Sequence, residues 1–553
     1  MRHDSHSRSI RPVALILTNL LLLGGTLLYF GCGGYPTSQP HMVSSAVLAR
    51  HTEAGVRVFG RYRIVKLPIH SGVTIWNPAQ VVRGPDDLMY VANHTGEIYS
   101  LRDTDGDGLE DEARLYHDVR ADGLRSPAGL AFRGDELFVG TAQEIRVYSD
   151  RDGNGQADTS YTFLGNLPHS EHPYEWTSGL TFGPDGSLYA ALATDSWNAG
   201  AAPDPEGWRG ALLRIAPDGS AVERIATGLR SVPAMIFDDE GNLFFLDNQG
   251  SGNANEELNL ATPGAFYGHN PQKYGRSDVT AAFLELLSDV APSGMTFNPA
   301  SNDFDGTAGD LFVSFYGPGE RWTRGSIARV HFHRDENGEL QAEEIPVLRD
   351  LPKISDLEFG PGGDLYATQM GMSDYWYQPL DEPDGAIYRI FFDASVEPDD
   401  LLEEEDAPAI ASDDRLALGR QLFADLACSA CHAVDGKTEL LGPNLKDIGR
   451  IYSREELLEE IQEPSRRIKP SMAPTRITKA DGEVLLGRVV SAGADGIRLM
   501  VVGNRILQIP RSEIRSEEPV MESLMWPGLL ASLSQDEVGA LLDYLEGLHL
   551  ENE

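Results

Sequence analysis

The stretch Gly179–Tyr189 reads GLTFGPDGSLY: a short apolar segment, a turn rich in glycine and aspartate, and a second apolar segment. Similar units recur around six leucines, at intervals of 49, 51, 55, 68 and 54 residues: Leu88, Leu137, Leu188, Leu243, Leu311 and Leu365. A period near 50 residues with several short strands is typical of propeller blades. The repeats therefore predict a six-bladed β-propeller over residues 50–395, with a large irregular β-sandwich as the alternative. Only Val279–Leu287 shows helical spacing in this region.

Length and charge limit the classes of protein that fit. The chain has 553 residues and a mass of 60.4 kDa, too long for one ordinary domain of about 150 residues. Its 45 basic and 85 acidic residues give a formal net charge of −40. This balance argues against nucleic acid as a partner, because phosphate binding needs clustered lysine and arginine. The three cysteines are too few for a disulfide framework, so each is interpreted from its surroundings.

The first cysteine, Cys32, ends an apolar run that begins at Pro12 and follows a flank with three arginines. A basic flank, an apolar run and a small residue before a cysteine are typical of a bacterial export signal. Residues 1–32 stay open to three interpretations: lipidation of Cys32, an uncleaved transmembrane anchor, or a cleaved signal. All three place the rest of the chain on the periplasmic or cell-surface side of a bacterial membrane, with residues 33–49 as a tether.

Two acidic loops between the early repeats share one spacing of oxygen ligands, at positions 1, 3, 5 and 9 with glycine at position 6. Their ligand candidates are Asp103, Asp105, Asp107 and Asp111 in the first loop and Asp150, Asp152, Asn154 and Asp158 in the second. Alternating carboxylates in a tight loop can converge on Ca²⁺, as in the opening half of an EF-hand loop. Neither loop has the flanking helices or the final glutamate of that motif. A polar hairpin tip without metal is the alternative.

A run of acidic residues separates the repeats from a second domain. Residues 397–406 hold seven carboxylates in ten positions, and such a block predicts an extended linker, which we assign to 396–410. The domain at 411–553 contains Cys428-Ser-Ala-Cys431-His432, the C-x-x-C-H pattern of covalent haem attachment, with the histidine as proximal iron ligand. A zinc half-site or a redox disulfide is the alternative, but the sequence has no second cysteine pair.

The surroundings of this motif are typical of a small helical haem domain. Gly419 and Phe423, four residues apart, are expected to meet Tyr544 on the last helix, which opens with the capping box Ser534–Glu537. The predicted distal iron ligand is Met525, in an irregular segment just before that helix, with Met521 as the alternative. Met500 stands in an alternating apolar strand and is interpreted as a core residue.

These motifs resemble a class I cytochrome c. His432 and Met525 are separated by 93 residues rich in strand patterns, which resembles the haem-binding domain of planctomycete-type proteins, where a small β insertion (here 474–516) splits the cytochrome. The match includes Glu463-Pro464-Ser465 before the insertion and Ser523-Leu524-Met525 after it. The resemblance implies that the Pro443 carbonyl accepts a hydrogen bond from the proximal imidazole. The proline that usually follows the methionine is displaced by Trp526.

The repeats resemble the quinoprotein glucose/sorbosone dehydrogenase group, including membrane-bound dehydrogenase-like proteins. The matching stretches are Gly228–Ser231 (GLRS), Asn255–Asn259 (NEELN) and Ser293–Phe297 (SGMTF). The resemblance implies a pyrroloquinoline quinone cofactor over the propeller mouth and oxidation of a sugar or alcohol.

The catalytic candidates follow from the same resemblance. Where the group has a catalytic histidine, this chain has Glu175, with His172 three residues upstream. Arg230 is expected to orient a quinone oxygen or to form a loop salt bridge, and Arg324 lies in a stretch that departs from the group's pattern. A carboxylate can act as base if burial raises its pKa.

Two functions are therefore expected as alternatives. In the first, the propeller oxidises a carbohydrate or alcohol and electrons pass through the fused haem c to an external redox acceptor. In the second, the propeller only binds a glycan or a protein, and the cytochrome domain serves a separate electron-transfer chain.

Overall fold

The computed structural model describes residues 43–398 and 413–548, apart from short gaps. The gaps are 54, 71–74, 76, 170–176, 195–203, 205, 249–255, 270–273, 287–290, 318–324, 336–337, 352, 372–384, 467, 469–471, 481, 494, 521 and 531–532. The predicted signal or anchor, including Cys32, lies outside the described residues. None of the helices in the described part is long and apolar enough to cross a membrane.

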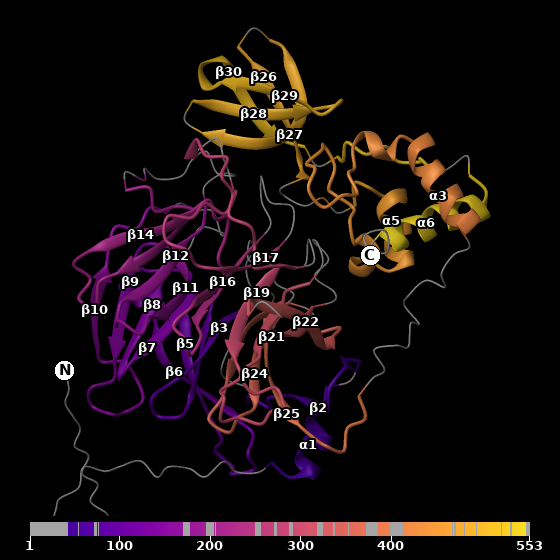
Figure 1. Ribbon diagram of the computed structural model, residues 1–553. Helices are drawn as coiled ribbons and strands as arrows, with labels where there is room; N and C mark the ends of the chain where they lie inside the picture. Colours follow the sequence, from indigo (N-terminus) through magenta and orange to yellow (C-terminus); the bar gives the residue numbers. More distant parts are fainter. Residues whose placement is uncertain are drawn as a thin grey trace, which may run out of the picture. The chain divides into compact units, whose positions relative to one another are not determined.

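Six antiparallel sheets fill the described part of residues 57–392 (Figure 1). The first sheet contains β3 (Pro78–Arg83), β4 (Met89–Asn93), β5 (Glu97–Arg102) and β6 (Glu112–Asp118). The second contains β7 (Gly129–Arg133), β8 (Glu136–Gly140), β9 (Ile145–Ser149) and β10 (Thr159–Leu164). The third contains β11 (Thr177–Phe182), β12 (Leu188–Leu192), β13 (Ala211–Ile215) and β14 (Val222–Thr227).

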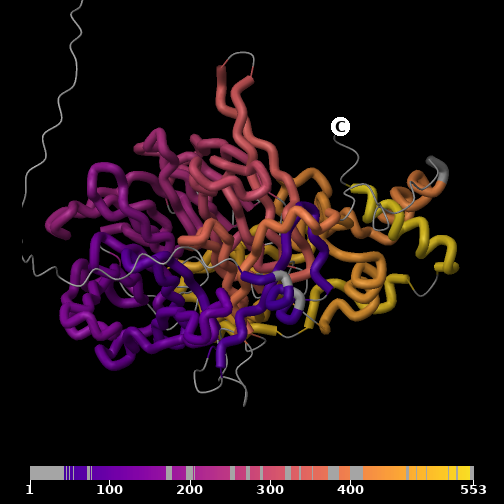
Figure 2. Tube along the Cα trace, turned by 90° about the horizontal axis from the view of Figure 1, so that it is seen from below, coloured from indigo at the N-terminus to yellow at the C-terminus, as the bar shows by residue number. Residues whose placement is uncertain are grey.

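The last three sheets follow the same plan, with two additions from the N-terminal side. The fourth contains β15 (Met235–Phe237), β16 (Leu243–Asp247), β17 (Glu257–Leu260) and β18 (Leu284–Glu285). The fifth contains β19 (Pro292–Phe297), β20 (Leu311–Phe315), β21 (Ser326–Arg334), β22 (Leu340–Arg349) and β1 (Arg57–Val58). The sixth contains β23 (Ile354–Phe359), β24 (Leu365–Gln369), β25 (Ala386–Phe392) and β2 (Tyr62–Lys66). The hairpin β21–β22 has the longest strands of these sheets and projects from them in Figure 2.

The sequence repeats coincide with these sheets. Each repeated leucine lies at, or within one residue of, the beginning of the second strand of its sheet. The turn before Leu188 shows the reason: Asp185 Oδ1 accepts the Ser187 N–H at 3.0 Å, and Gly186 adopts φ +77°. A local side-chain acceptor and a glycine with positive φ together set a tight hairpin.

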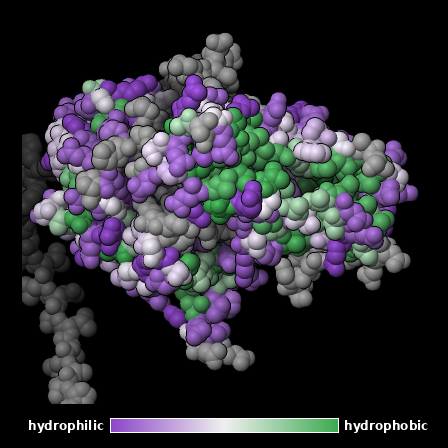
Figure 3. Space-filling view, turned by 90° about the horizontal axis from the view of Figure 1, so that it is seen from above, coloured by the Kyte–Doolittle hydropathy of each residue, from purple (hydrophilic) through white to green (hydrophobic). Residues whose placement is uncertain are grey.

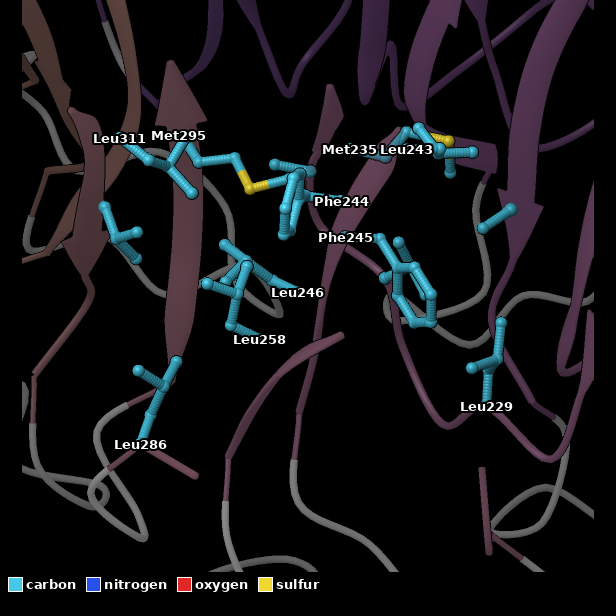
Figure 4. Packing of buried hydrophobic residues seen from close by; sticks show 14 of the residues in the cluster. Leu229, Met235, Leu243, Phe244, Phe245, Leu246, Leu258, Leu286, Met295 and Leu311 are labelled. Atoms are coloured by element: carbon cyan, nitrogen blue, oxygen red, sulfur yellow. The ribbon is translucent and has the colours of Figure 1, made fainter. Parts of the chain in front are cut away.

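The burial of the strands shows that the sheets pack face to face. The second strands β4, β16 and β20 are buried along their whole length, so both faces of these strands are covered. The fourth strands β6, β10 and β14 have several exposed residues. Figure 4 shows the largest cluster of buried hydrophobic residues, in which Phe244 and Phe245 of β16 point to opposite sides. Aromatic and aliphatic side chains thus fill the space between neighbouring sheets.

The six sheets follow one another around a closed ring of contacts. The first strand of each sheet contacts the first strand of the next, from β3 through β7, β11, β15 and β19 to β23, and β23 contacts β3. Serine hydroxyls join the starts of these strands: Ser178 to Val232 O at 2.6 Å, Ser293 to Ile354 O at 2.6 Å and Ser355 to Pro78 O at 2.5 Å. The starts therefore lie on one face of this propeller-like ring, which we call the front face.

Residues from both ends of the ring segment complete the sixth sheet. Strand β2 pairs with β25, with Tyr62 opposite Phe392. Before it, helix α1 (Ser45–His51) is capped by Ser44, and Val47 and Leu48 pack into the core below β2 and β3. A short 3-10 helix, η1 (Val119–Asp122), follows β6.

Residues 413–548 contain a helical domain and a separate sheet. The helices are α3 (Asp413–Asp425), η3 (Cys428–Ala430), α4 (Ile448–Ile451), α5 (Arg454–Gln462) and α6 (Gln535–Glu546). The predicted meeting of Phe423 and Tyr544 is confirmed, with ring centroids 5.5 Å apart, edge to face. The predicted capping box of Ser534 and Glu537 is also present at the start of α6.

The separate sheet lies between α5 and α6 in the sequence. Its strands are β26 (Pro474–Lys479), β27 (Val484–Gly493), β28 (Gly496–Val501), β29 (Arg505–Pro510) and β30 (Ile514–Pro519). Their order in the sheet is β29-β28-β27-β26-β30, and the 3-10 helix η5 (Arg511–Glu513) precedes β30. The pairing of β26 with β30 brings the beginning and the end of the inserted segment together. Ser523 N–H also donates to Ser465 Oγ at 3.1 Å. The sheet is therefore an insertion that leaves the helical domain continuous on either side.

The face of the molecule seen from above carries both hydrophilic and hydrophobic residues (Figure 3). Figure 3 shows hydrophobic residues gathered on the face seen from above. Among the large hydrophobic side chains of the described residues, Trp526 and Val502 are the most exposed, at 77% and 69%. Both belong to the C-terminal part of the chain.

Candidate functional sites

The C-x-x-C-H motif forms one helical turn at the end of α3. Cys428–Ala430 is the 3-10 helix η3, and the His432 N–H donates to Cys428 O at 2.9 Å. Cys428 and Cys431 are both half-buried. Two thiols on one turn, next to an imidazole, are the arrangement that covalent haem attachment requires.

The imidazole of His432 is oriented by the segment that follows. Its Nδ1 lies 2.8 Å from the Pro443 carbonyl oxygen, as the cytochrome resemblance implied. A Cβ atom at Gly442 would lie 2.6 Å from His432 Cε1, so only glycine allows the chain to pass this close to the ring. Burial lowers the pKa of His432, which favours the neutral imidazole. Because Pro443 engages Nδ1, Nε2 is the nitrogen left for iron.

The helices around this motif pack closely at two glycines. A Cβ at Gly419 on α3 would lie 2.1 Å from Ala540 O on α6, and one at Gly449 on α4 would lie 2.4 Å from Glu546 Cα. Arg454 on α5 links to α6 through Asp543 at 2.7 Å and Glu546 at 2.5 Å. Glycine contacts and ion pairs thus fix the helices that frame the haem motif.

The predicted distal ligand lies in a segment that reaches the motif. Met525 is half-buried, and its N–H donates to Ser523 Oγ at 3.1 Å. Its neighbour Leu524 packs in the same small cluster as Cys431 and Leu441. Met500 is buried on β28, with its sulfur 3.8 Å from Arg488 Nη2. Met521 lies outside the described residues. The two thiols and the imidazole fit a haem c with histidine as one axial ligand, and Met525 stays the predicted second ligand, since the methionine that shares a cluster with Cys431 is Met500.

The front face of the ring collects polar groups from several sheets. Because neighbouring strands are antiparallel, each second strand ends on this face, where each first strand begins. His94 follows β4, and Arg125 precedes β7. Burial, and then the positive charge of Arg125, lower the pKa of His94 to about 4, so it is neutral near pH 7.

Arg230 stands in a loop held by a buried carboxylate. Asp247, at the end of β16, accepts the N–H groups of Arg230 at 3.0 Å and Ser231 at 2.9 Å. Burial, together with the charge of Glu257, raises the pKa of Asp247 well above its usual range, and the two N–H groups oppose that shift. Lys353, before β23, is 6% exposed and donates to Gly371 O at 3.1 Å. Three cationic residues, Arg125, Arg230 and Lys353, therefore belong to the front face.

Three of the predicted catalytic candidates lie outside the described residues: His172, Glu175 and Arg324. In the sequence, Glu175 precedes the first residue of β11, Thr177, and Arg324 precedes the first residue of β21, Ser326. Both of these strand starts belong to the front face. His94, Arg125 and Lys353 were not predicted, because single polar residues beside short strands carry no motif.

The two acidic loops bring carboxylates together. Oxygen atoms of Asp103, Asp105 and Asp107 lie within 4.8 Å of one another, as do those of Asp150, Asp152 and Asp158. Asn154 donates to Asp152 through Nδ2 at 3.0 Å. Asp111 is engaged elsewhere: its Oδ1 accepts from Thr104 N–H at 2.8 Å, and its Oδ2 lies 3.3 Å from His70.

Comparisons with known families and structures divide the chain in the same way. Residues 416–482 match the cytochrome c family, and residues 81–309 match a family described as a domain of unknown function, DUF7133. No curated protein matches the chain. The C-terminal domain is therefore a cytochrome c domain, an electron-transfer module that carries haem c.

The ring is similar in fold to several solved structures. One is a putative oxidoreductase (glucose dehydrogenase) from Thermus thermophilus, with 19% identity, a TM-score of 0.45, and coverage of 60% of this chain and 100% of that chain. Another is the PQQ domain of pyranose dehydrogenase from Coprinopsis cinerea, with 11% identity, a TM-score of 0.46, and coverage of 61% and 97%. A third is the PQQ-bound aldose sugar dehydrogenase of Streptomyces coelicolor, with 18% identity, a TM-score of 0.42, and coverage of 60% and 99%.

Proposed function

We propose that this chain is an exported, membrane-tethered haem c oxidoreductase. Its six sheets act as the blades of a six-bladed β-propeller that oxidises a sugar or alcohol on the front face. Electrons then pass to the cytochrome c domain of the same chain and on to an external acceptor. The observation that carries this proposal is the gathering of cationic and titratable residues from several sheets on one face of a ring fused to a cytochrome c domain.

The residues of the front face suit an anionic quinone. Pyrroloquinoline quinone carries three carboxylates, and Arg125, Arg230 and Lys353 would supply the positive charge to hold them in a chain whose net charge is −40. Bound there, the quinone would supply the two-electron acceptor for the substrate. Asp247 fixes the backbone at Arg230 through two N–H bonds, so it would hold this side chain in place. His94, neutral near pH 7, would offer a hydrogen bond without adding charge.

The base that accepts the substrate proton is proposed from the sequence. Glu175 or His172 would take the hydroxyl proton of the alcohol, because both precede β11, which begins on the front face. A carboxylate in this role needs a pKa raised toward neutrality. The variants Glu175→Gln and His172→Ala distinguish the two residues, since only substitution of the residue that acts as the base should lower kcat by about 100-fold or more.

Calcium is proposed for both acidic loops. Each loop offers three carboxylates within reach of one ion. If the first loop binds Ca²⁺, adding the ion raises the unfolding temperature of the wild type, whereas Asp105→Asn with Asp107→Asn removes the part of that rise due to the first loop. An equal rise in wild type and variant would assign the ion to another site. Asp150 and Asp152 provide the matching pair for the second loop.

The membrane tether is also proposed from the sequence. Lipidation of Cys32, or a helix formed by the apolar run, would hold the chain at the periplasmic or cell-surface side of the membrane. Cys32→Ala separates the two, because only the lipid-anchored form would be released from membranes.

Haem reduction tests the enzymatic proposal. The purified full chain is supplied with pyrroloquinoline quinone and Ca²⁺, mixed with a panel of sugars and alcohols, and followed by the ferrous haem absorption. We expect substrate-dependent reduction that falls at least tenfold in Arg230→Ala and stays unchanged in Arg224→Ala, an exposed arginine on β14. If no substrate reduces a haem that dithionite does reduce, the propeller is a binding domain for a glycan or protein instead.

A further inference from the structure

The inserted sheet touches the haem motif through the turn between β28 and β29. Val502, Gly503 and Asn504 form this turn between the paired residues Val501 and Arg505, and Gly503 and Asn504 have φ of +85° and +57°, a left-handed backbone that glycine and asparagine favour. The side chain of Asn504 makes two hydrogen bonds to the helical domain. Its Nδ2 donates to Ala430 O at 2.8 Å, and its Oδ1 accepts the Leu441 N–H at 2.9 Å.

These two bonds join the segments on either side of the proximal histidine. Ala430 lies between Cys428 and Cys431, and Leu441 is two residues before Pro443, whose carbonyl engages His432. A third bond ties the same segments directly, from Gly442 N–H to Cys431 O at 2.8 Å. Asn504 therefore links the haem-attachment turn to the segment that orients the imidazole of His432.

Arg488 on β27 supports the same segment from the sheet. Its Nη2 donates to Leu440 O at 2.8 Å, and its Nη1 pairs with Glu439 at 2.9 Å. Arg488 is only 5% exposed, whereas its partner Glu439 reaches the surface with 38% of its side chain exposed. Val490 and Met500 of the sheet pack on Leu441 in the same place. The segment 439–443 is thus held by the insertion through polar and apolar contacts at once.

We propose that the inserted sheet sets the reduction potential of the haem, with Asn504 and Arg488 as positioning residues for the His432–Pro443 hydrogen bond. A proximal imidazole that donates strongly through Nδ1 is a more basic iron ligand and favours the ferric state. Loss of the hydrogen bonds made by Asn504 and Arg488 lets the Pro443 carbonyl move away from the imidazole of His432. The ferrous state is then stabilised relative to the ferric state, and the reduction potential rises. This inference rests on haem attachment at Cys428 and Cys431 and does not depend on substrate oxidation by the propeller.

Three variants of the full chain separate hydrogen bonding from backbone strain. Asn504→Gly keeps the positive φ and removes both side-chain bonds. Arg488→Met keeps the length of the side chain and removes the bonds to Glu439 and Leu440. Val502→Ala is the matched control, because Val502 lies in the same turn with its side chain 69% exposed. Potentiometric titration gives the midpoint potential, and exchange of the His432 Nδ1 proton reports the strength of its bond to Pro443.

We expect Asn504→Gly and Arg488→Met to change the ferrous-to-ferric ratio at a fixed potential by twofold to tenfold, a rise of about 18–59 mV for a one-electron couple. The Nδ1 proton should exchange faster in both, and neither quantity should change in Val502→Ala. If Asn504→Gly does not retain haem, Asn504→Asp takes its place, since it keeps the acceptor for Leu441 and loses the donor to Ala430. Unchanged potentials and exchange rates in Arg488→Met and the Asn504 variant, with full haem content, would overturn the proposal.

Discussion

At the scale of single residues, the bond between His432 Nδ1 and the Pro443 carbonyl marks the proximal side of the candidate haem, and Met525 is the predicted ligand on the other side. The Pro443 carbonyl oxygen lies 2.8 Å from Nδ1 of the His432 imidazole, which leaves the other ring nitrogen, Nε2, for iron. Leu524, the neighbour of Met525, packs in the cluster around Cys431. A histidine–methionine pair raises the potential of a haem relative to one with stronger donors.

Removal of the thioether tests the axial assignment. In Met525→Ala we expect the midpoint potential to fall by more than about 100 mV, since 59 mV corresponds to a tenfold change for a one-electron couple. The ferric haem should also bind added imidazole. Met472→Leu serves as the control and should behave as wild type. A normal potential in Met525→Ala, together with a lowered one in Met521→Ala, would move the ligand to Met521.

A half-buried carboxyl in the ring predicts a pH-dependent stability. Burial raises the pKa of Glu358 on β23 to about 7 from the usual 4.5, against the hydrogen bond from Thr296 and the charge of Arg83. A raised folded-state pKa stabilises the protein at low pH, and this stability is lost as pH rises from about 4.5 through 7. Glu358→Gln removes that dependence.

Urea unfolding of the ring between pH 5 and 8 measures the effect. At pH 8 we expect Glu358→Gln to be more stable than wild type by about 1–3 kcal/mol, since one pKa unit corresponds to about 1.4 kcal/mol. The exposed Glu343→Gln is the control and should keep the wild-type pH profile. Parallel profiles for wild type and Glu358→Gln would mean that Glu358 is ionised in the folded protein at the lower pH.

The haem motif was predictable from sequence because its chemistry is local: two thiols and an imidazole on one turn need no distant partner. Asn504 and Arg488 were not, because they reach the motif only after β27, β28 and β29 have paired. His94 and Lys353 belong to one face for the same kind of reason, since 259 residues (353 − 94) separate them in the sequence. A single asparagine in a hairpin turn signals the turn and not its partner.

At the scale of elements, the crossing of α3 and α6 depends on a residue without a side chain. A Cβ atom at Gly419 would lie 2.1 Å from Ala540 O and 2.6 Å from Tyr544 Cβ. The two helices could accommodate it only by moving apart, which would also separate Phe423 from Tyr544.

Gly419→Ala should therefore destabilise the cytochrome c domain by about 1–3 kcal/mol, the usual cost of overpacking. Thermal unfolding followed by the haem absorption measures it. Gly547→Ala is the matched control: it has a helical φ of −83°, and its Cβ would meet only Leu416 at 3.6 Å. We expect that change to stay within about 0.5 kcal/mol of wild type. Equal stability of both variants would contradict the close crossing.

The sequence predicted the repeated strands well and two other elements poorly. The six leucines mark second strands because those strands are largely buried and bounded by local turns. Val279–Leu287 has helical spacing, but the described residues 276–286 contain no helix. Leu284 instead pairs with Leu258 in the fourth sheet, so pairing with a distant strand outweighs the local pattern. Strand β30 was not predicted, because its residues Ile514–Pro519 are largely polar and exposed.

At the scale of the whole molecule, a buried ion cluster joins the first acidic loop to the sixth sheet. Arg389 on β25 donates to Gly108 O at 2.6 Å and pairs with Glu110 at 3.3 Å and Asp364 at 2.8 Å. Tyr366 on β24 donates to the other oxygen of Glu110 at 2.5 Å. The cluster therefore fastens the first sheet to the last, where the ring closes.

Arg389→Met should weaken this closure strongly. It leaves Glu110 and Asp364 with uncompensated charge in a mostly buried site, a change that costs about 3–5 kcal/mol. Urea unfolding of the ring measures the loss, with the exposed Arg224→Met as control. Adding Glu110→Gln and Asp364→Asn to Arg389→Met should restore much of the stability. A single variant as stable as wild type would show that the cluster does not hold the ring together.

The pairing of β2 with β25 also sets the order of events in biosynthesis. Lys66 at the end of β2 and Ala386 at the start of β25 are 320 residues apart (386 − 66), so the strand made first waits for the one made last. At roughly 5–20 residues per second, that wait is about 16–64 s. During it, the edge of β2 is unpaired and open to wrong partners. A chain that is stalled or cut before residue 386 would carry an incomplete ring, so quality control of this protein is expected to act on chains that end before β25.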